Sequence, residues 1–146
     1  MKTEFLHFFI FSTVFSHDDR IDVWSAGCIL AEMAMGGKPF LPGSNIDDQL
    51  RRIIKVFGTP SERSWPGVKT LPELNHNKIA SIRFERGIGL ANTLENYVCN
   101  SFITGTNNAA ATLTESGLDL LKLMLVPCPF KRLTTTEVLH HPYFDD

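Results

Sequence analysis

The feature that most constrains the fold is residues 21–35, a segment that is apolar on almost every face of a helix. A helix of this kind belongs in the middle of a core, so we expect the rest of the chain to pack around it. One acid, Asp22, stands near its start, and Gly36 and Gly37 follow it, as glycine commonly follows the last residue of a helix. The sequence therefore predicts one central buried helix that carries a single carboxylate.

Three further segments show helical spacing or helix-capping residues, and the predicted helices cover residues 20–36, 44–57, 114–126 and 134–141. Residues 68–112 form an irregular insert, and no segment has the alternation of a strand. The sequence therefore predicts an all-α fold. The expected helix caps are Ser44 with Asp47, then Thr112 or Thr114, and then Thr134 with Glu137.

The length and composition fit one globular domain. The 146 residues are 43% hydrophobic and 21% charged, with a formal net charge of −2, so the basic excess that favours nucleic-acid binding is missing.

The three cysteines are odd in number and widely spaced, which favours a reducing compartment inside the cell, nuclear or cytoplasmic, over a disulfide framework. Cys28, on the central helix, is expected to be an inert small hydrophobic residue. The adjacent His140 and His141 would point about 100° apart on a helix, so no metal site is expected there.

Residues 1–17 form an apolar leader that is distinct in composition from the rest of the chain. Its apolar run covers residues 5–15, well short of the roughly 20 residues that span a bilayer. The run is followed by polar residues without a small-residue cleavage site, so we expect neither a membrane span nor a secretory signal. The leader is instead expected to pack poorly.

Three quoted stretches carry a resemblance to a known family. They are "IDVWSAGCILAEM", "GKPFLPGSNIDDQLRRIIKVFGTPSERSWPG" and "LDLLKLMLVPCPFKRLTTTEVLHHPYF". Together they resemble the C-terminal half of a cyclin-dependent-type serine/threonine protein kinase. Asp22, Trp24 and Gly27 are similar to the Asp-x-Trp-Ser-x-Gly motif of protein kinases, and "GTPSE" with "WPG" narrows the resemblance to the cyclin-dependent group. The resemblance implies that residues 18–146 are part of a kinase C-lobe, without the β-rich N-lobe and the catalytic loop.

The resemblance also implies structural roles for two charged residues. The carboxylate matching Asp22 accepts backbone N–H bonds from the catalytic loop, and we expect this structural role for Asp22. The alternative, which the residues alone would favour, is that Asp22 merely sits in the first helical turn, stabilised by the helix dipole. Arg132 matches the arginine that pairs with the Glu of Ala-Pro-Glu, and here it either lacks that partner or turns to solvent. Cys128 replaces the Asp expected before Pro129, a departure from the family pattern.

Phosphoryl transfer requires a glycine-rich phosphate loop, a strand Lys, His-Arg-Asp with a downstream Asn, and Asp-Phe-Gly. The 146 residues contain none of these motifs, and their one Gly-x-Gly, at Gly87 and Gly89, is expected to be a turn. We therefore assign no catalytic, cofactor-binding or metal residue; ATP and Mg belong to the full-length family. The expected function is that of a catalytically inactive kinase fragment, and the alternative is a non-catalytic binding module or decoy that uses the C-lobe docking surface.

The helix at residues 44–57 is the candidate partner surface. In some cyclin-dependent kinases this region receives substrates or a small adaptor, and full-length members also bind a cyclin. Asp47 stands where the family usually has Ile, so the helix could instead only pack on its own core. The candidate surface residues are Asp48, Arg51, Arg52 and Trp65.

Overall fold

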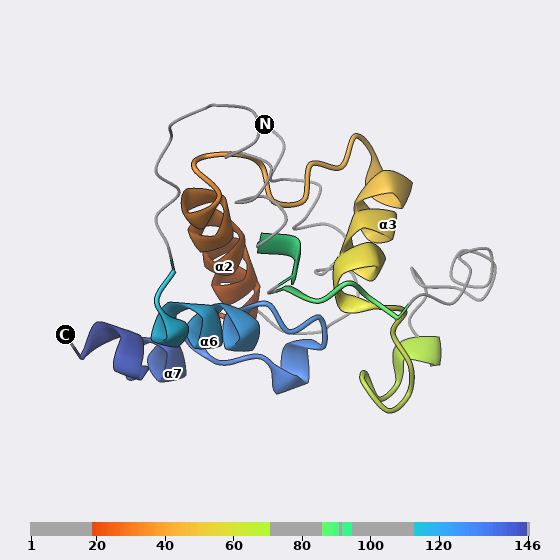
Figure 1. The fold of residues 1–146 in the computed structure, drawn as a ribbon. Helices are drawn as coiled ribbons and strands as arrows, with labels where there is room; N and C mark the ends of the chain where they lie inside the picture. Colours follow the sequence, from red (N-terminus) through yellow and green to blue (C-terminus); the bar gives the residue numbers. More distant parts are fainter. Residues whose placement is uncertain (1–18, 71–85, 91, 95–112, 146) are drawn as a thin grey trace.

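The computed structural model describes residues 19–70, 86–90, 92–94 and 113–145, and no strand occurs within these ranges. The all-α prediction is confirmed for this part of the chain. The expected leader at residues 1–17 and most of the expected insert at residues 68–112 lie outside the described residues. The α-helices are α2 (Arg20–Ala34), α3 (Ile46–Phe57), α6 (Glu115–Met124) and α7 (Thr135–Leu139), and the short 3-10 helices are η1 (Val68–Thr70), η3 (Pro129–Lys131) and η4 (Pro142–Phe144) (Figure 1).

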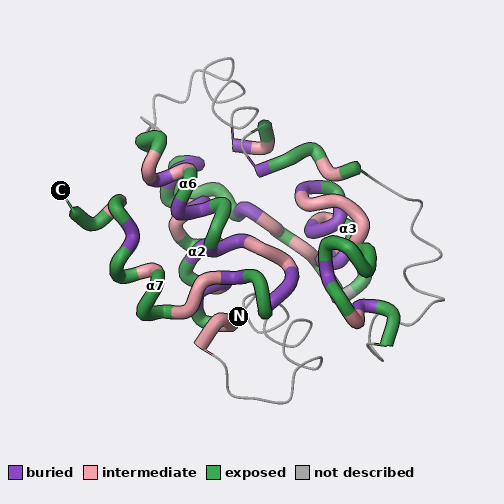
Figure 2. The backbone as a smooth tube through the Cα atoms, turned by 90° about the horizontal axis from the view of Figure 1, so that it is seen from below, coloured by how far each residue is buried: buried purple, intermediate pink, exposed green. Residues whose placement is uncertain are grey.

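Helix α2 packs against both C-terminal helices, α6 and α7, and α6 also contacts η4. Helix α3 lies on the other side of α2 from α7 (Figure 1). The main hydrophobic core joins α2, α3 and the segment that follows α6, and it includes Trp24, Ile54 and Leu125. Buried positions recur along α2, α3 and α6, whereas α7 is largely exposed (Figure 2). The core thus sits between α2, α3 and α6.

The contact between α2 and α6 depends on Gly27, which is buried on α2. A Cβ atom at this position would lie 2.9 Å from Cδ2 of Leu125 and 3.1 Å from Cβ of Met124. Both distances are shorter than ordinary van der Waals contact. The absence of a side chain at Gly27 therefore allows α6 and its last residues to lie directly on α2.

Three of the expected helix ends are confirmed in detail. Gly36 and Gly37 adopt φ angles of 69° and 79°, which glycine accepts readily, and they end α2. At α7, the Thr134 side chain accepts a bond from the Glu137 N–H, and the Glu137 carboxylate accepts one from the Thr134 N–H at 2.7 Å, forming the predicted capping box. At α6, the Thr114 side chain accepts a hydrogen bond from the Gly117 N–H at 3.1 Å. Of the two expected caps, Thr112 and Thr114, Thr114 is therefore the one that forms.

The expected cap of α3 was wrong by one residue. Asn45, not Ser44, is the N-cap, because its side chain accepts a hydrogen bond from the Asp48 N–H at 2.9 Å. Asp48, not Asp47, reaches back and accepts from the Ser44 N–H at 2.9 Å. Serine and asparagine cap helices about equally well, so residue type alone could not fix the register.

The expectation that α2 is buried all round was also wrong. Val23, Trp24, Gly27, Ala31 and Ala34 are its buried residues. On another face, Ile29 and Met33 expose 56% and 64% of their surface. In the described part of the chain, α2 is therefore buried along the side that meets α3, α6 and α7.

We expect the replacement Gly27→Val to lower the free energy of unfolding by about 2 kcal/mol or more, because overpacking a filled contact forces side chains or backbone to move. Urea unfolding followed by circular dichroism measures the change. The matched control is Ala26→Val, at an exposed neighbouring position on the same helix, which should cost only about 0.5 kcal/mol in helix propensity. Equal stability of the two variants would contradict the close contact.

Candidate functional site

The side chain of Arg132 forms the centre of the site, and only 2% of its surface is exposed. Its guanidinium donates three hydrogen bonds to backbone carbonyls. Nε bonds the Val126 oxygen at 2.9 Å, Nη2 the Pro127 oxygen at 3.2 Å, and Nη1 the Arg20 oxygen at 2.6 Å. A buried charge is tolerated when its donors are satisfied in this way. Arg132 therefore stays inside the protein, and the alternative that it turns to solvent is wrong.

The indole of Trp24 covers one side of this guanidinium. Cζ of Arg132 lies 4.9 Å from the ring centroid, within the range of a cation–π interaction. The ring of Phe57 packs on Trp24 at a centroid distance of 5.6 Å, so α3 joins the same cluster. Trp24 is 1% exposed, and its Nε1–H has no hydrogen-bond partner in the part of the chain that the structure describes. Trp24 thus links the charged centre to the core through its ring faces.

The start of α2 is held by two residues that the sequence analysis did not select. Nε of Arg20 donates to the Arg132 carbonyl at 3.1 Å, so each arginine binds the backbone of the other. The Asp19 carboxylate accepts from the Thr135 N–H at 2.8 Å and also from the Thr135 hydroxyl, at the N-terminus of α7. No sequence signal marked these contacts, because each joins positions more than a hundred residues apart.

Asp22 does not belong to this centre. It is exposed in the first turn of α2, and no hydrogen bond to its carboxylate occurs among the described residues. In this first turn an acid interacts favourably with the helix dipole. The bonds from a catalytic loop stay a prediction, because the 146 residues do not include that loop. Of the four motif residues, the structure brings Trp24 and Arg132 together, places Gly27 at the contact with α6, and leaves Asp22 at the surface.

Cys128 stands at the position where the family resemblance implies an Asp. Its side chain is 2% exposed and belongs to the main core. It precedes η3 without making a side-chain cap, and its carbonyl accepts a hydrogen bond from the Lys131 N–H at 3.1 Å. Cys128 thus contributes an apolar contact to the core at this position.

Burial raises the pKa of the Cys28 thiol from 9.0 to about 12, and the nearby Glu32 carboxylate adds to the rise. The thiolate is the reactive form of cysteine. Cys28 therefore stays protonated at physiological pH, in agreement with the expectation of an inert residue.

The four candidate partner residues do not form one surface. Asp48 and Arg52 make an ion pair along α3 at 3.1 Å, and Arg51 is exposed beside them. A backbone hydrogen bond from Ser44, followed by the bond from Arg52, holds the pKa of Asp48 below its usual value. Trp65 is instead 6% exposed and belongs to the core, so it offers no exposed ring to a partner.

The Gly-x-Gly segment lies against the C-terminal end of α3. The N–H of Ile88 donates to the Lys55 carbonyl at 2.8 Å, and the N–H of Gly89 to the Val56 carbonyl at 2.9 Å. These bonds satisfy carbonyls that the end of a helix leaves open.

Within the described ranges, no three His, Cys, Asp or Glu side chains could hold a metal ion, and no helix is long and apolar enough to cross a membrane.

The replacement Arg132→Ala should lower the free energy of unfolding by about 3 kcal/mol or more, because it leaves buried carbonyls without donors and removes the cation from Trp24. Arg132→Lys should recover less than half of the loss, since a single ammonium cannot reach all three carbonyls. Urea unfolding gives the values. Asp22→Asn is the control and should change stability by less than about 0.5 kcal/mol; a loss for Arg132→Ala as small as this would contradict the role of Arg132.

Alkylation by iodoacetamide at pH 9 should label Cys28 at least about a hundredfold more slowly in the native chain than in urea. The native thiol, with a pKa of about 12, is almost wholly protonated at this pH, whereas the unfolded thiol, near 9.0, is about half ionised. Peptide mapping by mass spectrometry measures the rate at Cys28 separately. Equal native and unfolded rates would show that the thiol is not shielded.

Comparison with known proteins places these features in a family. The family model of the protein kinase domain matches residues 12–144, so the match begins inside the expected leader. The chain is also 41% identical over 124 residues to cell division control protein 2 homolog 1 of Trypanosoma brucei brucei, an alignment that covers 85% of this chain and 38% of that protein. The chain thus spans well under half the length of this relative. It belongs to the protein kinase family and, within that family, is a fragment of the cyclin-dependent type.

Proposed function

We propose that the 146-residue chain is a structural part of a cyclin-dependent-type kinase and that it neither binds ATP nor transfers phosphate by itself. In a longer protein that carries this segment, the domain would transfer the γ-phosphate of ATP, with Mg, to serine or threonine residues of proteins. The role of the present residues would be to provide the helical scaffold for that chemistry.

The proposal rests mainly on the hydrogen bonds that the backbone N–H groups of the Gly-x-Gly segment make. Phosphate loops bind nucleotide through free backbone N–H groups. Here the N–H groups of Ile88 and Gly89 are already bonded to carbonyls of α3. The buried guanidinium of Arg132 is likewise engaged by backbone carbonyls. These groups, which in other settings bind phosphate, thus serve the scaffold in this chain.

A second function, as a binding module, is favoured by the exposed polar face of α3. Asp47, Arg51 and Lys55 are exposed on this helix, beside the ion pair of Asp48 and Arg52. A mixed-charge face of this kind suits the rim of a protein interface, where charges govern specificity more than affinity. A cyclin or a small adaptor, the partners that the family resemblance implies, would be candidates for this face in the longer protein.

Isothermal titration of the purified chain with Mg-ATP should give no saturable heat, because the N–H groups of Ile88 and Gly89 in the Gly-x-Gly segment are already bonded to α3. A complete cyclin-dependent-type kinase, titrated under the same conditions, serves as the positive control. Saturable binding to the 146-residue chain would overturn the proposal, and so would transfer of labelled phosphate to a protein substrate.

A further inference from the structure

A cavity of about 500 Å³ lies between the C-terminal half of α3, the loop at residues 58–65 and the turn at residues 126–128. Neither the family resemblance nor the proposed function uses it. Its volume falls within the roughly 300–1,000 Å³ of typical small-molecule sites. The site is separate from nucleotide chemistry, so its test is independent of the ATP titration.

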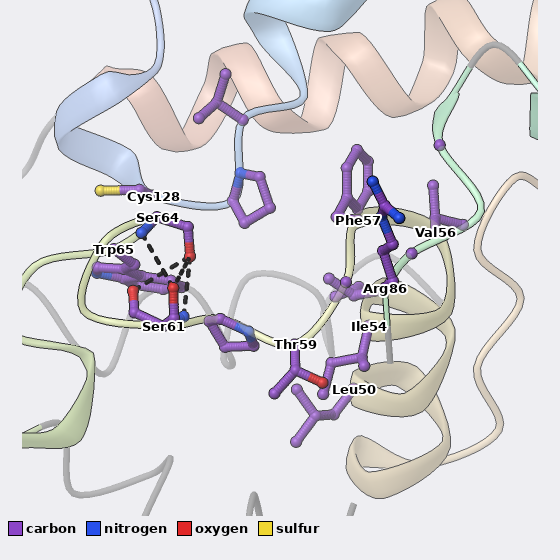
Figure 3. Close-up of a pocket in the computed structure, with 17 residues that line it drawn as sticks. Leu50, Ile54, Val56, Phe57, Thr59, Ser61, Ser64, Trp65, Arg86 and Cys128 are labelled. Atoms are coloured by element: carbon purple, nitrogen blue, oxygen red, sulfur yellow. Dashed lines mark hydrogen bonds between the residues drawn. The ribbon is translucent and has the colours of Figure 1, made fainter. Parts of the chain in front are cut away.

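The walls of the cavity are mainly apolar and come from two sides (Figure 3). Leu50, Ile54 and Phe57 of α3 form one side, and Trp65 and Cys128 stand on the other. Ile54 and Cys128 are almost fully buried, so these walls are held by the core itself. An apolar ligand could therefore enter a largely preformed space.

The polar groups on the Trp65 side are satisfied by each other. The N–H of Ser61 donates to Oγ of Ser64 at 2.9 Å, and the hydroxyl of Ser64 lies 3.2 Å from both the carbonyl and the hydroxyl of Ser61 (Figure 3). These serines therefore place little demand on a ligand for hydrogen bonds.

Among the described residues that line the cavity, Arg86 is the charged one, and it stands on the α3 side next to Phe57 (Figure 3). Arg86 is exposed, and within the described residues its guanidinium makes no hydrogen bond or ion pair. Its backbone is fixed by Gly87, where a Cβ atom would lie 2.4 Å from the Gly58 nitrogen and where φ is +24°. The next residue, Ile88, is hydrogen-bonded to α3. The guanidinium of Arg86 is thus held at the edge of an apolar space, and none of the described residues that line this space is an acid.

We propose that this cavity binds a small amphipathic carboxylate, with the hydrocarbon tail between Ile54 and Trp65 and the carboxylate on Arg86. The apolar walls match the tail, since a mostly apolar lining with few polar groups is typical of ligand sites. The guanidinium matches the head group, because its planar donors bind a carboxylate in a bidentate manner. The positive charge of Arg86 favours an anion over a neutral or cationic ligand of the same shape.

Isothermal titration of the full chain with decanoate and with the uncharged decan-1-ol tests the proposal. Decanoate should bind saturably, with one site per chain. Arg86→Gln should weaken it about tenfold, the loss expected for one charge-assisted contact, and should leave decan-1-ol unchanged. Arg86→Lys keeps the charge and should stay within about threefold of the original chain. Arg51→Gln, which removes an exposed cation of α3 outside the cavity, is the matched control and should bind decanoate normally.

The proposal is overturned if decanoate binds the original chain and Arg86→Gln equally well, or if no variant binds it saturably. It is also overturned if light scattering shows a dimer that decanoate does not dissociate and that Trp65→Ala abolishes, because a second copy would then occupy the cavity. Far-UV circular dichroism of each variant, matched to that of the original chain, ensures that a loss of binding reports on Arg86 and not on unfolding.

Discussion

The described structure depends on the burial of one guanidinium. Arg132 binds carbonyls that follow α6 and the carbonyl of Arg20 at the start of α2, although the two arginines are 112 positions apart. The charge needs several acceptors inside the protein. The Val126 and Pro127 carbonyls, which follow the end of α6, each gain a donor from it. Because Arg20 binds the Arg132 carbonyl in return, the start of α2 and the segment that follows α6 are fixed as a single unit.

This unit decides which side of α2 is buried. The indole of Trp24 must face Arg132, and Gly27 must face α6, where there is no room for a side chain. With these two positions fixed, the 3.6-residue period of the helix turns Ile29 and Met33 away, and the structure leaves them exposed. The composition of α2 indicated burial correctly, but it could not indicate which side would be buried.

The parts of the fold that could be predicted from sequence are those with a local cause. The capping box of Thr134 and Glu137, the glycines after α2 and the four helical segments each follow from residues within a few positions of one another. The cap of α3 failed because Ser44 and Asn45 are both good caps and stand side by side. The family motif identified Trp24, Gly27 and Arg132 as structural, but the acceptors of Arg132 depend on how distant segments meet, and no local pattern contains that information.

The cavity beside α3 is the feature that could be predicted least from the sequence. Its walls combine a helix, the loop that contains Trp65 and the turn that contains Cys128, and its charge comes from Arg86 in a segment that looks irregular in sequence. Taken alone, Arg86 is an ordinary surface cation and Trp65 an ordinary core aromatic residue. Together they can form one site because Gly87 lets the backbone lie against the end of α3. This contact places the charge of Arg86 beside the apolar cavity. A binding site of this kind can be inferred from the geometry of the chain, whereas residue spacing identifies only sites whose residues share a motif.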